Sequence, residues 1–107
     1  MVREITLVFV MVVATSVLLS ANGKKVFETY CWGCHHQTAV AFGPSFEEIA
    51  SKRSAEEIEA MIIDPATISQ ILGYKRNAMP SFLLSSEELA SITAYILSFK
   101  KKGDDNR

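Results

Sequence analysis

The stretch Cys31-Trp32-Gly33-Cys34-His35 decides how the rest of this chain is interpreted. Two thiols three positions apart lie on one side of a single turn, where both can form thioethers with the vinyl groups on one porphyrin edge. The residue after the second thiol is then carried under the iron, where an imidazole can be the proximal axial ligand. C-x-x-C-H is the attachment signature of a c-type haem. It predicts one covalent haem c, attached through Cys31 and Cys34, with His35 as a ligand to iron.

Three other functions are possible for a C-x-x-C-H motif: a disulfide, a redox pair and a zinc site. A structural disulfide between the cysteines would not need the histidine, and a thioredoxin-like redox pair would need a βαβ context that the sequence lacks. A zinc site would have to use Cys31, Cys34, His35 and His36, all within six residues. Tetrahedral zinc usually draws its four ligands from two separated pairs, so haem attachment explains the motif better.

Residues 1–21 differ from everything after them. An almost unbroken apolar run from Ile5 to Leu19 follows Arg3, and small or polar residues follow the run. Its length suits a secretory h-region and falls short of the ~20 residues of a good membrane span. We expect a signal peptide over 1–21, with an uncleaved N-terminal anchor as the alternative, and a mature domain over 22–107. Either way we expect export to the periplasm, which agrees with haem attachment by an extracytoplasmic assembly system.

The mature domain has nearly balanced charge. Residues 22–107 contain ten Lys and Arg and eleven Asp and Glu. No basic face for nucleic acid stands out, and one small domain is all that this length allows.

Helical spacing predicts an all-α fold of four to five short helices. We expect a first helix over 23–30, a loop over 36–44 and no long amphipathic pattern over 64–84, apart from a short turn at 68–72 before Gly73. Asp64-Pro65 should end a helix, because the residue before proline is pushed out of the α region. Leu89, Ile92, Ile96 and Phe99 form the stripe of a closing helix that should end at Lys100–Gly103. Three capping boxes mark helix starts, at Ser45-x-x-Glu48, Ser54-x-x-Glu57 and Ser85-x-x-Glu88.

The second axial ligand should be Met79. Pro80 biases it to an extended backbone in an irregular segment, from which its side chain can project inward. Met61 lies on an apolar helical stripe and is better explained as a core gap-filler. His36 is adjacent to His35 and cannot reach the opposite face of a haem, so we expect it at the surface.

At this point the chain resembles a small bacterial class I cytochrome c, over essentially all of residues 22–107. The resemblance is carried by Gly23, Phe27, Cys31, Cys34, His35, Gly43-Pro44, Met79-Pro80 and Tyr95, and by the ligand separation 79 − 35 = 44. It implies a haem enclosed by an all-α fold whose first and last helices cross, so that Gly23 and Phe27 meet Tyr95. It also implies that the Pro44 carbonyl accepts a hydrogen bond from His35. For the haem propionates, the candidate partners are Lys52, Arg53, Tyr74, Lys75 and Arg76.

The expected function is one-electron transfer rather than catalysis, because both axial positions of the iron would be filled. The resemblance implies partners such as a quinol-oxidising complex, a periplasmic dehydrogenase or a terminal oxidase, and a monomer that is soluble unless residues 1–21 anchor it. The alternative is a dedicated haem c subunit of a periplasmic enzyme, for instance a sulfur-compound oxidising dehydrogenase. A gas sensor or peroxidase would need Met79 to leave the iron, and no distal acid–base pair suggests one.

The same interpretation predicts a geometry. His35 and Met79 should point into a central slot from opposite walls. Cys31 and Cys34 should line one edge of the slot, with their sulfurs unpaired and both aimed inward. The side chains that we expect to face the slot are Phe46, Ile58, Met61, Ile71, Phe82 and Ile96.

Overall fold

The computed structural model of the chain describes residues 22–101, so the predicted leader 1–21 lies outside the described residues. The described part is helical and contains no strand, which confirms the all-α prediction. Over the same residues, no helix has both the length and the apolar character that crossing a membrane requires. The helices are α2 (Gly23–Val26), the π-helix η1 (Phe27–Cys31), α3 (Phe46–Lys52), α4 (Ala55–Ile63), α5 (Pro65–Ile71) and α6 (Ser86–Leu97).

Serine caps begin three of these helices, as the sequence predicts. The side chains of Ser54 and Ser85 accept hydrogen bonds from the backbone N–H three residues later, and Glu57 and Glu88 accept in return from the serine N–H groups. Each pair of bonds satisfies two backbone donors that a helix start leaves without a helical partner. Ser45 caps α3 by the first of these bonds only.

The segment after α4 corrects one expectation. Asp64 ends α4, as the following proline predicts, but its side chain also caps a new helix that begins at Pro65. Proline suits a first helical position, because its missing N–H would have no helical partner there. The predicted short turn at 68–72 is therefore the second half of a seven-residue helix, which ends before Gly73.

The closing helix also ends earlier than expected. Helix α6 stops at Leu97, and the N–H groups of Phe99 and Lys100 bond to carbonyls three residues back. Such bonds tighten a last turn into a 3₁₀ form. The basic residues expected in the last helical turn thus lie beyond it.

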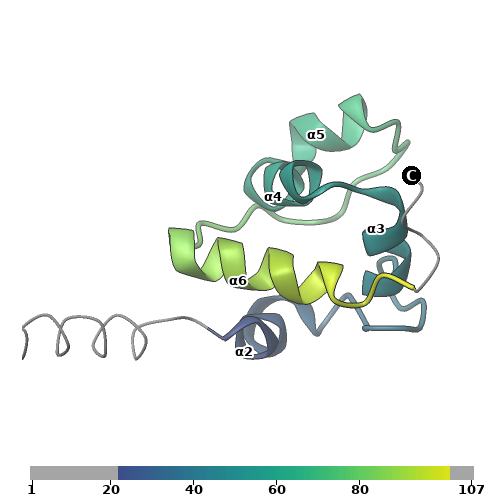
Figure 1. Cartoon of the computed structure of the whole chain (residues 1–107). Helices are drawn as coiled ribbons and strands as arrows, with labels where there is room; N and C mark the ends of the chain where they lie inside the picture. Colours follow the sequence, from purple (N-terminus) through teal and green to yellow (C-terminus); the bar gives the residue numbers. More distant parts are fainter. Residues whose placement is uncertain (1–21, 102–107) are drawn as a thin grey trace, which may run out of the picture.

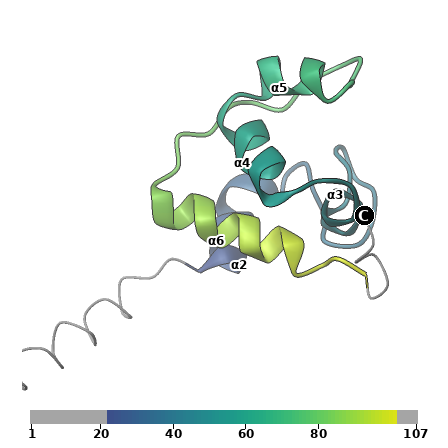
Figure 2. The same ribbon diagram turned by 45° about the horizontal axis from the view of Figure 1, so that its top comes forward.

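Helix α6 is the centre of the fold. Helix α2 crosses it on one side, α4 and α5 lie on the other, and α3 lies near its C-terminal end (Figure 1, Figure 2). The crossing is close because Gly23 has no side chain: a Cβ there would lie 2.7 Å from the Tyr95 Cβ and would also meet the Ser91 carbonyl. Phe27 extends the contact between the two helices, since the centroids of the Phe27 and Tyr95 rings are 5.8 Å apart. The expected crossing of the first and last helices is confirmed.

The buried core gathers around this crossing and the inner face of α4. Of the side chains predicted to face a central slot, Phe46, Ile58 and Ile96 are buried, and Phe82 packs against them. Met61 is only half-buried. Ile71 lies outside this core, with 72% of its surface exposed. The core consists of Val26, Phe27, Phe46, Ile58, Ile62, Ile92 and Ile96.

The exposure of Ile71 follows from where α5 begins. A helix that starts at Pro65 buries Pro65 and Ser69, which are four residues apart and share a face. Ile71 is two positions past Ser69 and therefore lies on the opposite side of the helix. The helix start at Pro65 therefore decides the direction of Ile71.

Candidate functional site

The ring of His35 is fixed from three directions. Its Nδ1 lies 2.7 Å from the Pro44 carbonyl oxygen, which confirms the expected hydrogen bond. Its face stacks on the ring of buried Phe46, with the ring centroids 5.6 Å apart. Gly43 packs so closely that a Cβ there would lie 2.7 Å from the ring carbon Cε1 and 3.0 Å from Nδ1.

The hydrogen bond decides which nitrogen of His35 is free to bind a metal. A carbonyl oxygen can only accept, so Nδ1 must carry the proton. In the neutral ring, Nε2 then has the lone pair. An N–H donated to a backbone carbonyl is the usual way in which a metal-binding histidine is oriented.

The loop that holds Pro44 is anchored at several points. Gly43 donates to the Cys34 carbonyl at 2.6 Å, and Phe46 donates to the His36 carbonyl at 3.0 Å. The Nδ1 of His36 accepts from the N–H groups of Thr38 and Ala39, and its side chain is exposed, as expected. These bonds hold the Pro44 carbonyl against His35.

Cys31 and Cys34 are unpaired thiols at the end of η1 and just after it. Their unpaired state contradicts the disulfide alternative. Cys31 is half-buried and packs against the core, whereas Cys34 is exposed. Burial raises the pKa of the Cys31 thiol to about 11, with a smaller contribution from Cys34. Cys31 is therefore a neutral thiol at neutral pH.

Nothing in residues 22–101 supports the zinc alternative. No group of three or more His, Cys, Asp or Glu side chains in that range converges on a metal position. The predicted donors instead comprise two thiols, one imidazole and one thioether, the set that a covalent haem with His/Met ligation requires.

Met79 lies in an irregular segment that the chain holds in place. The Asn77 side chain brackets it, accepting from the Met79 N–H and donating to the Met79 carbonyl, both at 3.2 Å. Three residues later, the Phe82 N–H donates to the Ile62 carbonyl at the end of α4. The Met79 side chain is half-buried and packs against the core to which Phe46, the stacking partner of His35, also belongs.

Two aromatic rings connect the segment that contains Met79 with the turn that contains the cysteines. Tyr30, the residue before Cys31, contacts Phe82 edge to face, with the ring centroids 5.8 Å apart. This contact brings together segments that lie fifty residues apart in the chain.

Arg53 provides a test of whether the site fits a haem. Its Nε is buried and, among the described residues, has no hydrogen-bond partner. Its Nη2 donates to the Tyr74 hydroxyl at 3.1 Å, and its Cζ lies 5.2 Å from the centroid of the Tyr74 ring. Its Nη1 forms a long ion pair with Glu57 at 4.0 Å, which leaves Nε as the donor without an acceptor. A buried guanidinium donor without an acceptor suits a carboxylate, and a haem carries two as propionates.

The other propionate candidates offer no such donor. Lys52 pairs with Glu48 at 3.6 Å, and Lys75 and Arg76 are exposed. The sequence placed Arg53 among five equivalent candidates, because only the folded chain shows which of them is buried. It missed Asn77 altogether, although an asparagine two residues before an X-Pro step is a typical turn-forming signal.

The comparisons with known proteins agree with this geometry. The family model for cytochrome c matches residues 20–100, which is most of the chain. No curated protein and no solved structure matches. Because the family model covers far more than half of the sequence and includes Cys31, Cys34 and His35, the chain belongs to the cytochrome c family, which implies covalent haem c and haem-based electron transfer.

Proposed function

We propose that this protein is a periplasmic electron carrier of the small bacterial class I type. Cys31 and Cys34 would attach the haem, and His35 and Met79 would be the two ligands of its iron. The observation that carries the proposal is the 2.7 Å contact between His35 Nδ1 and the Pro44 carbonyl, which leaves Nε2 as the free ligand nitrogen. The bound haem supplies an iron that exchanges one electron between Fe(II) and Fe(III).

The residues of the chain set the conditions for that exchange. Pro44, Gly43 and Phe46 hold the His35 ring in one orientation, so little of the ligand arrangement has to reorganise when the charge on the site changes. The bracket from Asn77 holds the backbone of Met79. A thioether ligand stabilises the ferrous form relative to a second imidazole, which raises the reduction potential. If His35 and Met79 both bind the iron, no position would be left for substrate, which suits a carrier role.

Two substitutions test the ligand assignment. Met79→His should keep a six-coordinate, low-spin haem and lower its midpoint potential substantially, because a stronger donor replaces the thioether. Met61→Leu is the matched control and should leave the potential nearly unchanged. Spectroelectrochemistry and the far-red absorption of the iron–sulfur bond measure both. Loss of that absorption in Met61→Leu would reverse the assignment of the two methionines.

A second test concerns attachment. Cys31→Ala and Cys34→Ala should sharply lower the yield of stable holoprotein, because both thiols tether the group that completes a small core. Haem staining after denaturing electrophoresis measures covalent haem, and a normal yield in both variants would contradict the proposed role of these cysteines.

The proposed location and partners rest on the apolar run at 5–19 and on the family. We propose export to the periplasm and electron exchange, as a monomer, with a quinol-oxidising complex, a dehydrogenase or a terminal oxidase. The alternative is a dedicated haem subunit of a periplasmic dehydrogenase. Purification from cell fractions distinguishes them, since a carrier elutes alone and a subunit elutes with its enzyme.

A further inference from the structure

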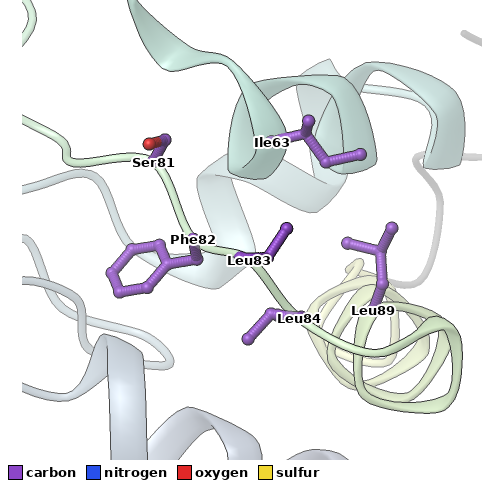
Figure 3. Close-up of a pocket in the computed structure, with 6 residues that line it drawn as sticks. All are labelled: Ile63, Ser81, Phe82, Leu83, Leu84 and Leu89. Atoms are coloured by element: carbon purple, nitrogen blue, oxygen red, sulfur yellow. The ribbon is translucent and has the colours of Figure 1, made fainter.

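A groove of about 230 Å³ opens on the surface between the end of α4 and the start of α6. Figure 3 shows its walls, with Leu83 near the middle, Ile63 on α4, and Leu84 and Leu89 toward α6. The side chain of Leu83 is fully exposed at 103%, and that of Ile63 is 55% exposed. The lining residues are Ile63, Ser81, Phe82, Leu83, Leu84 and Leu89.

The fold does not account for the exposed leucine. Burial alternates along residues 81–84, where Ser81 and Leu83 are exposed and Phe82 and Leu84 are half-buried. Phe82 and Leu84 pack against the core, and Leu83 is left in solvent. A polar residue at 83 would serve the fold equally well. An isolated exposed leucine is ordinary, whereas exposed apolar side chains that gather at a groove mark an interaction site.

The elements around the groove carry charge of one sign. Helix α4 contributes Glu56, Glu57 and Glu59, and the first turn of α6 contributes Glu87 and Glu88. Glu57 forms an ion pair with Arg53 at 4.0 Å, so the negative charge comes mainly from the other four. Residues 54–73 and 77–99 contain no Lys or Arg, and these two stretches hold six carboxylates in all, including Asp64. Such an uneven distribution attracts a cationic surface and repels an anionic one over roughly one Debye length.

We propose that this groove docks a partner protein that presents an apolar side chain ringed by Lys or Arg. A second copy of the chain would bring two acidic faces together, and an anionic lipid surface would be repelled by the same carboxylates. The inference concerns protein docking and does not depend on the axial ligands or on the direction of electron flow.

A synthetic amphipathic helical peptide serves as the probe, with leucines on one face and lysines on either side of them. Labelled with a fluorophore, it should bind the purified holoprotein, as measured by fluorescence anisotropy, and binding should weaken as salt is added. A matched peptide with glutamate in place of lysine should not bind. Leu83→Ser should weaken binding on the order of tenfold, the scale on which truncation of a central interface side chain acts.

Two further variants separate the groove from general surface effects. Val40→Ser removes another apolar side chain, 79% exposed in the loop at 36–44, and should leave peptide binding unchanged. The double substitution Glu59→Gln and Glu87→Gln should weaken binding and flatten its salt dependence. Leu83 makes no contribution to the core, so Leu83→Ser is expected to fold, and circular dichroism checks this.

The opposite outcomes overturn the proposal. They are absent peptide binding, equal binding by the glutamate peptide, and equal weakening by Val40→Ser and Leu83→Ser. Self-association of the free protein that Leu83→Ser abolishes, measured by sedimentation, would assign the groove to a second copy. Leu83-dependent binding to vesicles containing anionic lipid would assign it to a membrane.

Discussion

Replacing Gly43 by alanine tests whether the close packing of the loop against the His35 ring matters for stability. The added Cβ would lie 2.7 Å from His35 Cε1, 3.0 Å from Nδ1 and 3.2 Å from Nε2, whereas ordinary contacts begin at 3.4 Å. The ring and the loop must therefore separate by about 0.7 Å (3.4 − 2.7). Neither side yields easily, since Gly43 donates to the Cys34 carbonyl at 2.6 Å and the ring is held by Pro44 and Phe46.

The size of the effect follows from three contributions. Overpacking of this kind costs ~1–3 kcal/mol, and losing the His35–Pro44 hydrogen bond costs about 1 kcal/mol more. The lower chain entropy of alanine in the unfolded state offsets ~0.4–1 kcal/mol. We expect Gly43→Ala to lower the free energy of unfolding by ~1–3.6 kcal/mol, and to move the midpoint potential if the displaced ring is the iron ligand that we propose.

Gly33 provides the matched control. It lies inside the C-x-x-C-H motif, yet a Cβ there meets no atom within 4 Å. Gly33→Ala should therefore be neutral or slightly stabilising and should leave the potential unchanged. Guanidinium denaturation followed by circular dichroism gives the stabilities, and spectroelectrochemistry gives the potentials. If Gly43→Ala matched Gly33→Ala in both, the close packing against His35 would have no energetic consequence and the reasoning would be refuted.

Three other substitutions test the core, the helix crossing and a helix cap. The free energy of unfolding of the holoprotein is measured by chemical denaturation in each case. Ile92→Ala should destabilise by ~2–5 kcal/mol, because Ile92 is fully buried at 0% exposure; a loss below ~1 kcal/mol would contradict its central place in the core. Gly23→Ala should cost ~1–3 kcal/mol by forcing α2 away from α6 at Tyr95, and unchanged stability would mean that the crossing is looser than described. Ser85→Ala should cost about 1 kcal/mol by removing the cap of α6, whereas Ser86→Ala, at the first helical position, should not.

The sequence predicted best where the signal was local. The capping boxes at Ser54 and Ser85 are complete within four residues, and the structure contains both. Asp64-Pro65 was interpreted only as the end of a helix, although aspartate and proline in that order also begin one. Without that start, the phase of the helix and the direction of Ile71 could not be predicted from the sequence.

In the candidate site, too, some contacts could be predicted from the sequence and others could not. The contact between His35 and Pro44 spans nine residues and followed from the family resemblance. The burial of the Arg53 Nε and its contacts with Tyr74, twenty-one residues away, depend on how α3 packs against the segment after α5. No periodicity or spacing in the sequence reports such a contact, since it arises only when distant segments meet.

The wide turn η1 restricts how the chain length before Cys31 can vary. Its N–H bonds reach five residues back, as from Trp32 to the Phe27 carbonyl at 3.0 Å, so each residue advances by a smaller angle than in an α-helix. Phe27 can then face Tyr95 on α6 while Tyr30 reaches Phe82 on the opposite segment. Deleting one residue from this turn would restore an α-helical register, in which Phe27 and Tyr30 could no longer make both contacts. The number of residues between Gly23 and Cys31 is therefore fixed by the two aromatic contacts that this segment has to make at once.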